Sequence, residues 1–169
     1  LNLLIVIDRE TRKIKWEHRD LTFGHQHDCH ILDNGNIMVF CNGFHGRDVD
    51  MTSSVREFNY DSLETVWEFM ANPLTSFFSA NISGAQRLWS GNTLICEGLW
   101  GRIFEVTPDC EIVWEFINPQ VVDDFPRHYA ETYRVVPLRK VGDSIKLLAA
   151  LPPHERVLER IRNRTKLRP

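Results

Sequence analysis

The sequence predicts an all-β protein built from β-propeller blades, and three observations support this. Short apolar segments recur in a fixed order: one that follows a Gly-Asn turn, one that has Glu as its next-to-last residue, and one that contains Trp-Glu. The closing tryptophans, Trp16, Trp67 and Trp114, are separated by 51 and 47 residues. Each segment is too short for a long helix and is bounded by Gly, Asn, Pro or Asp. A period of about 40–50 residues with several short strands is typical of propeller blades.

The third copy of the repeat is the clearest, and the first is truncated. The matching segments are residues 91–96, 101–106 and 111–116 in the third copy, 35–40, 55–58 and 64–69 in the second, and 3–8 and 13–18 in the first. Residues 61–63 and 107–110 carry Asp, Ser or Pro where tight turns need them, so each predicts a hairpin. The tryptophans are expected to pack between blades.

The repeats give approximate units of 1–20, 21–72, 73–120 and a partial 121–140. One blade uses about four strands, so residues 1–140 hold about three blades. Three blades cannot close a ring, since propellers need about four or more. The chain is therefore expected to be a piece of a longer propeller, or half of a six-bladed ring that a homodimer completes.

Residues 141–169 are expected to form a C-terminal extension that is mainly helical and basic. From residue 151 onward it has six basic and two acidic side chains. Pro152 and Pro153 precede a predicted helix from His154, with apolar residues on one stripe. This tail is interpreted as a solvated helix, with docking on the acidic body or on a partner as the alternatives.

Composition excludes several classes of function. The chain is 43% hydrophobic and 25% charged, as in ordinary globular proteins, and its net charge of -3 gives no reason to expect nucleic acid. It has no run of about 18 apolar residues that would span a membrane. It also lacks a Gly-rich phosphate loop and a Gly-x-Ser-x-Gly elbow. The four cysteines have no CxxC spacing and are interpreted as small apolar strand residues, with a disulfide left open.

The densest polar cluster is residues 25–30, which open the second unit. If this segment is a strand, His25, His27 and Cys29 point to one face. His27 is then a candidate nucleophile or acid–base group, because imidazole titrates near neutrality. The same three side chains suit zinc or copper. The third interpretation is a hydrogen-bonded strand entrance near the propeller axis.

Two arginines are candidates for anion binding, because a guanidinium fits sulfate or phosphate oxygens. Arg47 lies in a loop after the next strand, where a plain surface arginine is the alternative. Arg102 immediately precedes the strand segment that contains Phe104 and Glu105. Its alternative role is pairing with a neighbouring strand or carboxylate.

Several segments together resemble the arylsulfotransferase family of bacterial β-propellers. The most specific lie between residues 83 and 119. The matching segments are residues 77–79, 82–88, 91–95, 101–108 and 112–119, with 25–28, 33–36 and 42–43 in the same order upstream. The resemblance covers roughly residues 3–137, and the tail after about residue 140 has no counterpart.

The resemblance implies a six-bladed propeller that transfers a sulfo group from an aryl sulfate to a phenol, by ping-pong chemistry through a sulfated histidine. It places that histidine at His27, with His25 and Arg47 as helpers. It also implies substrate contacts from Arg102, Asn42 and His128. No cofactor, metal, nucleic acid or membrane partner is expected. The family is often periplasmic or otherwise extracytoplasmic.

The chain departs from the family pattern at three places. Cys41 stands where the family has Asp, and Ser54 and Glu131 stand where it has arginines. Losing two cations from a sulfate site would weaken anion binding by several kcal/mol, at about 1.5–3 kcal/mol for each charged hydrogen bond. A non-catalytic propeller module for binding or assembly is therefore the alternative function, and a metal-binding propeller is a third.

Overall fold

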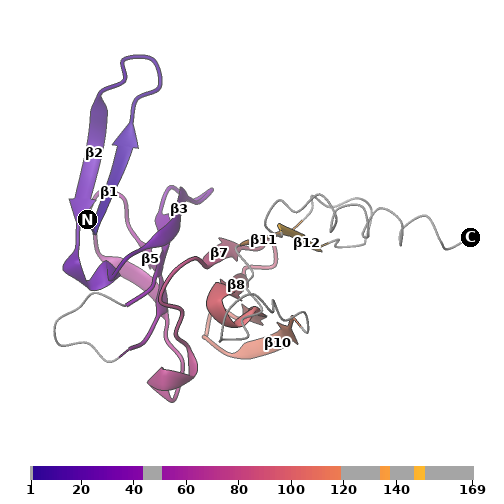
Figure 1. The fold of residues 1–169 in the computed structure, drawn as a ribbon. Coiled ribbons are helices and arrows are strands. Elements are labelled where there is room, and N and C mark those ends of the chain that lie inside the picture. The colour runs from indigo at the N-terminus through magenta and orange to yellow at the C-terminus, as the bar shows by residue number, and fades with distance from the viewer. Residues whose placement is uncertain (1, 44–50, 119–133, 138–146, 151–169) are drawn as a thin grey trace, which may run out of the picture.

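The computed structural model describes residues 2–43, 51–118, 134–137 and 147–150, which are mostly short antiparallel strands (Figure 1). They form two four-stranded sheets with the orders β3-β4-β5-β6 and β10-β9-β8-β7, and two two-stranded sheets, β1-β2 and β11-β12. The all-β fold class predicted from the sequence is confirmed. The helices in the described ranges are single 3-10 turns, and none is long and apolar enough to cross a membrane.

The strands follow the repeat. The first sheet contains β1 (Leu3–Ile7) and β2 (Ile14–Arg19); the second contains β3 (His27–Ile31), β4 (Ile37–Cys41), β5 (Ser54–Phe58) and β6 (Thr65–Phe69); the third contains β7 (Gly84–Arg87), β8 (Thr93–Glu97), β9 (Arg102–Val106) and β10 (Ile112–Ile117); the fourth contains β11 (Arg134–Pro137) and β12 (Leu147–Ala150). The 3-10 turns are η1 (Leu21–Phe23), η2 (Leu74–Ser76) and η3 (Gly98–Trp100).

Strands β4 and β8 are buried along their whole length. The second sheet packs against the β1–β2 pair on one side and against the third sheet on the other. Alternate residues of β4 enter two different cores: Ile37, Val39 and Cys41 pack toward β1–β2, and Met38 and Phe40 pack toward the third sheet. The alternation of a strand puts successive side chains on opposite faces. A strand that is buried on both faces needs an apolar residue at every position, and Ile37–Cys41 has this composition.

Four phenylalanines form the centre of the core between the second and third sheets. Phe77, from the crossover between β6 and β7, has ring centroids 5.6 Å from Phe40 and 5.5 Å from Phe69 and Phe104. Phe69 and Phe104 are also 5.5 Å apart. These tilted and edge-on contacts are the geometry that aromatic pairs prefer. The crossover is thereby fixed between the two sheets.

Three hairpin turns close in a similar way, the third being one residue shorter than the other two. Arg12, Leu63 and Cys110 occupy equivalent places, with positive φ angles of 57°, 63° and 66°. Each of their amides donates a hydrogen bond to the carbonyl of the residue that opens the turn, at 2.8, 3.0 and 2.9 Å respectively. The turns predicted at 61–63 and 107–110 are confirmed.

The repeated tryptophans link consecutive sheets. Trp16 Nε1 on β2 donates to the Tyr60 carbonyl at 3.1 Å, and Trp67 Nε1 on β6 donates to the Pro108 carbonyl at 2.8 Å. Each acceptor lies in the outer hairpin turn of the next sheet, so one bond pattern is used twice. Packing between units, as predicted, is confirmed for these two tryptophans. Trp114, at the same place on β10, is 39% exposed.

The C-terminal segment differs from the sequence-based expectation. Strand β12 lies inside residues 141–169, which were predicted as a mainly helical extension, yet it pairs with β11 in the register Arg134↔Ala150 to Pro137↔Leu147. Strand pairing therefore continues past the boundary predicted at residue 140. The helix predicted from His154 falls in residues 151–169, outside the described residues. All four cysteines, which lie in the described ranges, are free thiols.

The indole bond between sheets can be tested with Trp67→Phe, which removes the donor and keeps an aromatic ring. The Pro108 carbonyl then loses its partner, and the free energy of unfolding is expected to fall by about 1 kcal/mol. Urea denaturation followed by circular dichroism measures this. Trp89→Phe, at an exposed indole, is the control and is expected to change stability by less than about 0.5 kcal/mol. Equal effects would contradict the linking role.

Candidate functional site

His27 and Asn42 meet where β3 begins and β4 ends. His27 is paired in register with Phe40, and Asn42 follows the last residue of β4. The side chain of Asn42 is fully buried, and its Oδ1 lies 2.7 Å from His27 Nδ1. Gly43 follows with φ of +73°, and a Cβ there would collide with the Thr52 carbonyl. The Asn-Gly pair is thus needed for the chain to turn away directly behind the histidine.

The surroundings of Asn42 determine which nitrogen of His27 carries the proton. Asn42 Nδ2 lies 2.7 Å from the Ser79 carbonyl and 3.0 Å from the Ile82 carbonyl. Both neighbours only accept hydrogen bonds, so the amide must direct NH₂ toward them and Oδ1 toward His27. Oδ1 accepts, hence Nδ1 of His27 donates a proton to it. The neutral imidazole then has its lone pair on Nε2.

Buried serines hold this arrangement rigid. Ser53 Oγ donates to the Asn42 carbonyl at 3.0 Å and accepts from the Ser79 amide at 2.9 Å. The Ser53 amide donates to the Phe77 carbonyl at 2.9 Å. These bonds fasten the crossover loop to the ends of β4 and β5. The sequence did not indicate Ser53 or Ser79 as site residues, because no pattern of residue spacing predicts a hydrogen bond between two loops.

His25 lies beside His27 but outside the strand. Its exposed ring has a centroid 5.0 Å from that of His27, and its backbone has a positive φ of 72°. Asp28 also has a positive φ, of 50°, and the register of β3 shifts between His27 and His30. The simple alternation expected for residues 25–30 is therefore wrong, because a bulge interrupts it.

The metal interpretation of His25, His27 and Cys29 depended on that alternation. Across residues 2–43 and 51–118, no group of three or more His, Cys, Asp or Glu side chains gathers as a metal site would require. Asp28 instead reaches β7, where its Oδ2 accepts from the Ala85 amide at 3.2 Å. A Cβ on Gly84 would collide with that carboxylate, so this contact requires glycine.

Arg102 is held by two carboxylates. Its Nη1 lies 3.3 Å from Glu97 Oε2, its Nε bonds Glu115, and its guanidinium lies 4.4 Å from the centre of the Phe104 ring. Burial raises the pKa of Glu97, although hydrogen bonds from the Phe78 amide and Arg102 act to lower it. Pairing with a carboxylate, which the sequence offered as the alternative role of Arg102, is the geometry observed.

The groove that Arg102 lines has a volume of about 620 Å³ and does not include His27. Its other walls come from Met51, Trp100 and Ile117, among others. The structure thus brings together His25, His27 and Asn42, and places Arg102 in a separate groove. Arg47 and His128, the remaining predicted site residues, lie outside the described residues.

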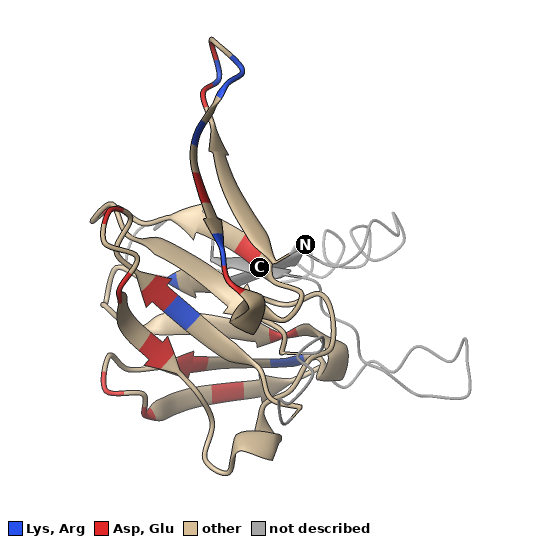
Figure 2. Ribbon diagram, turned by 90° about the vertical axis from the view of Figure 1, so that its left-hand side faces the viewer, with Lys and Arg blue, Asp and Glu red and all other residues tan. Residues whose placement is uncertain are grey.

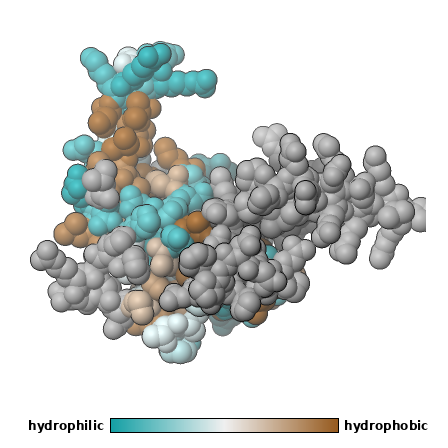
Figure 3. All heavy atoms as spheres, in the orientation of Figure 1, coloured by the Kyte–Doolittle hydropathy of each residue, from teal (hydrophilic) through white to brown (hydrophobic). Residues whose placement is uncertain are grey.

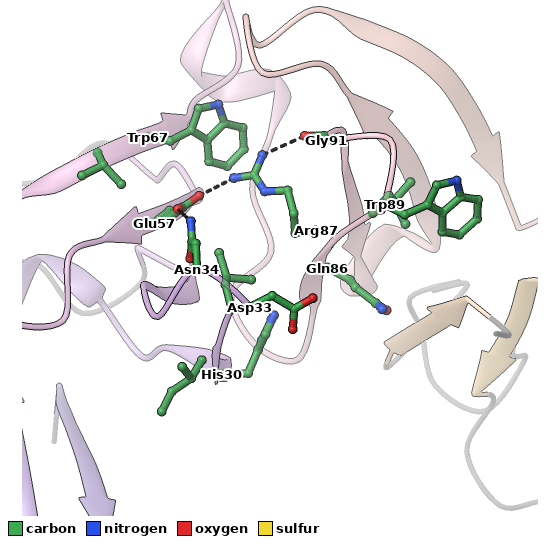
Figure 4. Close-up of a pocket in the computed structure, with 13 residues that line it drawn as sticks. His30, Asp33, Asn34, Glu57, Trp67, Gln86, Arg87, Trp89 and Gly91 are labelled. Carbon is green, nitrogen blue, oxygen red and sulfur yellow. Dashed lines mark hydrogen bonds and ion pairs between the residues drawn. The ribbon is translucent and has the colours of Figure 1, made fainter. Parts of the chain in front are cut away.

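A larger groove of about 820 Å³ opens between the second and third sheets, at the other end of β3 from His27 (Figure 4). Its cation, Arg87, points toward Glu57 and lies beside the face of Trp67, while Trp89 stands on the far side. Arg87 Nη2 is 2.5 Å from Glu57 Oε2, and its guanidinium is 4.7 Å from the centre of the Trp67 ring. The charge of Arg87 is thus compensated within the protein.

Glu57, on β5 of the second sheet, contacts Arg87, on β7 of the third sheet, across this groove. Burial acts to raise the pKa of its carboxyl, but hydrogen bonds from Asn36 at 2.7 Å and Asn34 at 3.0 Å, together with Arg87, hold that pKa below its ordinary range. The Asn36 contact recurs in the third sheet, where Asn92 donates to Glu105 at 2.7 Å. The repeat thus reproduces this bond along with the tryptophan bond.

Comparison with known proteins adds little to this geometry. No model of a known protein family matches the chain. No curated protein matches it either. A solved structure described as a protein of unknown function from Bacteroides caccae is similar, with 14% identity and a TM-score of 0.40. The match covers 69% of this chain and 54% of that one, so the chain spans about half of that structure's length.

The Glu57 carboxylate gives a pH-dependent prediction. Its folded pKa lies below the unfolded value of about 4.3, so its stabilising contribution is complete above that pH and is lost as pH falls through the folded pKa. Glu57→Gln removes this titration. Between pH 7 and pH 3, the melting temperature of this variant should fall less steeply with decreasing pH than that of the unaltered protein. Glu105→Gln is the matched control, and an equally shallow fall there would contradict the assignment.

Proposed function

We propose that this chain is an arylsulfotransferase-like β-propeller module in which Nε2 of His27 accepts the sulfo group. The observation that carries the proposal is the fixed orientation of the Asn42 amide, which leaves the lone pair of His27 on Nε2. A nucleophilic imidazole needs one nitrogen held by a hydrogen bond and the other unprotonated. The sequence resemblance supplies the substrate class, an aryl sulfate and a phenol.

The propeller part of the proposal is supported by the repeated bonds between sheets. In this arrangement the second and third sheets are complete blades with β3 and β7 on the inner side, near the axis. The bonds Trp16–Tyr60 and Trp67–Pro108 then join successive blades at their outer hairpins. His27 begins an inner strand, so in this arrangement it lies near the central channel that propeller blades surround.

The sulfo group is transferred in two steps, and in each step one bond to sulfur forms while another breaks. First, Nε2 attacks sulfur, an N–S bond forms, the S–O bond to the aryl group breaks, and the phenolate leaves with its electron pair. The ring gains a positive charge, and the Nδ1–H···Oδ1 bond to Asn42 becomes charge-assisted and stronger. Second, a phenol oxygen attacks sulfur and the N–S bond breaks. His25, whose ring centroid is 5.0 Å from that of His27, is the group proposed to take the phenol proton.

The second candidate is a non-catalytic binding or assembly module on the same scaffold. The observation that favours it is the engagement of Arg102 by Glu97 and Glu115, which leaves that cation poorly suited to sulfate. Ser54, which stands where the resemblance places an arginine, is buried and uncharged. Under this alternative the protein would bind a partner without turnover, since fold alone does not determine function.

His27→Asn distinguishes the two candidates. With 4-nitrophenyl sulfate as donor and phenol as acceptor, the proposal predicts turnover by the unaltered chain and a loss of about 10³-fold or more in the variant. Intact-protein mass spectrometry should show one added sulfo group on the unaltered chain after donor alone, and none on His27→Asn. His30→Asn, on the same strand, is the control and should retain both signals. No turnover and no added mass in the unaltered chain would favour the binding module.

The proton position on His27 is an independent readout of the same proposal. ¹⁵N NMR of the neutral imidazole, assigned by its loss in His27→Asn, should show a protonated Nδ1 and an unprotonated Nε2. A proton on Nε2 would contradict the assignment, because the nucleophilic lone pair would then point at Asn42.

A further inference from the structure

We propose that a second copy of this chain completes the fold, with β12 of one copy pairing with β1 of the other. The two two-stranded sheets would then merge into one composite blade, β11-β12 from one copy and β1-β2 from its partner. Two copies related by a twofold axis would form two such blades and close one ring. This inference rests on the blade arrangement proposed above and is independent of sulfo transfer.

The two small sheets are complementary halves of the same unit. The β1–β2 hairpin corresponds to the outer pairs β5–β6 and β9–β10, because each of the three has a positive-φ residue at the end of its turn and a tryptophan on its second strand. The β11–β12 pair corresponds to the inner pairs, since β11 contacts β7 and β8 of the preceding sheet (Figure 1). In the described ranges, β1 pairs only with β2 and β12 only with β11. Among the described strands, each half thus has one edge that no further strand pairs with.

The outward face of the third sheet is the surface that the partner would cover. Phe69 on β6 is 2% exposed because the next sheet covers it, whereas Phe116, its equivalent on β10, is 44% exposed. Phe116 and Trp114 lie on the same face as Ile103, next to the small core of Leu94 and Cys96. An apolar face that is covered in one repeat and open in the next indicates a missing neighbour.

The hairpin carries the matching apolar surface. Ile5 is paired with Glu17, on the face opposite to Leu4, which packs against the second sheet. This isoleucine corresponds to Phe104, which packs on Phe69. Ile5 is 45% exposed, and Figure 3 shows hydrophobic atoms along the hairpin below its hydrophilic tip. In the composite blade, the partner's Ile5 would pack on Phe116 as Phe104 packs on Phe69.

The charges of the two surfaces are complementary. Residues 2–19 carry five basic and three acidic side chains, whereas residues 102–118 carry one basic and four acidic. Figure 2 shows both signs gathered along the projecting hairpin and mostly acidic positions on the strands of the sheets below it. Opposite charge favours encounter of the two surfaces and fixes their orientation. It also disfavours pairing of two acidic outer faces with each other, so the occupant is the hairpin.

The internal repeats predict the register of the new pair. In the third sheet, Thr93 is opposite Val106 and Cys96 is opposite Ile103. Because the β11–β12 register matches that of β7–β8, Leu147 should lie opposite the partner's Ile7 and Ala150 opposite the partner's Leu4. Trp114 Nε1 should then donate to the carbonyl of the partner's Arg9, which corresponds to Tyr60 and Pro108.

The first test is the solution mass by light scattering on a sizing column. The 169-residue chain should have twice its mass of 19.8 kDa. Phe116→Lys, at a side chain exposed within one copy, should leave the circular dichroism spectrum intact and give a monomer. Leu21→Lys, at another exposed apolar side chain, is the control and should remain a dimer. A folded monomer of the unaltered chain at all concentrations would overturn the inference, because closure would then need further polypeptide.

The second test is register-specific. Both variants are made in a Cys29→Ser background. A chain with Ala149→Cys is mixed under mild oxidation with a chain with Ile5→Cys, because Ala149 is expected to lie opposite the partner's Ile5. A disulfide between the two chains is expected, while Ile14→Cys, on the far strand of the hairpin, should not form one with Ala149→Cys. Equal crosslinking of both would overturn the proposed pairing. A monomer that still becomes sulfated at His27 would reject this inference alone, and a dimer without sulfation would reject only the proposed chemistry.

Discussion

The burial of β4 and β8 on both faces is the constraint on which the rest of the structure depends. Each of these strands supplies side chains to two cores, so a sheet on its own would leave both of its apolar faces in water. Burial of apolar area contributes about 25 cal/mol per Å², and a single face is a large share of a marginal stability. Consecutive sheets must therefore stack, and the tryptophan bonds at the outer hairpins link each sheet to the next.

The candidate site is a consequence of that stacking. Phe77 anchors the crossover in the core, and Ser79, two residues later, supplies a carbonyl to Asn42. Asn42 in turn follows β4, the strand buried on both sides. The proton position on His27 is thus determined by the packing of two sheets and not by any contact within its own strand. A loosened core would be expected to release the histidine before it unfolded the sheets.

The sequence was informative wherever a feature repeats locally. Strand order, the turns at Leu63 and Cys110, and the packing of Trp16 and Trp67 all follow from patterns within one unit. The features that it did not predict depend on distant or backbone atoms. Asn42 is oriented by carbonyls 37 and 40 residues away, which carry no side-chain signal. The positive φ of Asp28 breaks the expected alternation, and Arg102 is engaged by carboxylates from two other strands.

Native-state hydrogen exchange in Phe104→Ala measures whether the sheets are stable only as a stack. Phe104 belongs to the third sheet and packs on Phe69 of the second. If the sheets depend on one another, amides of β4 and β8 lose protection by the same amount, about 3–5 kcal/mol for a buried phenylalanine. Loss confined to β8, with β4 unchanged, would show that the sheets unfold independently and would contradict the account.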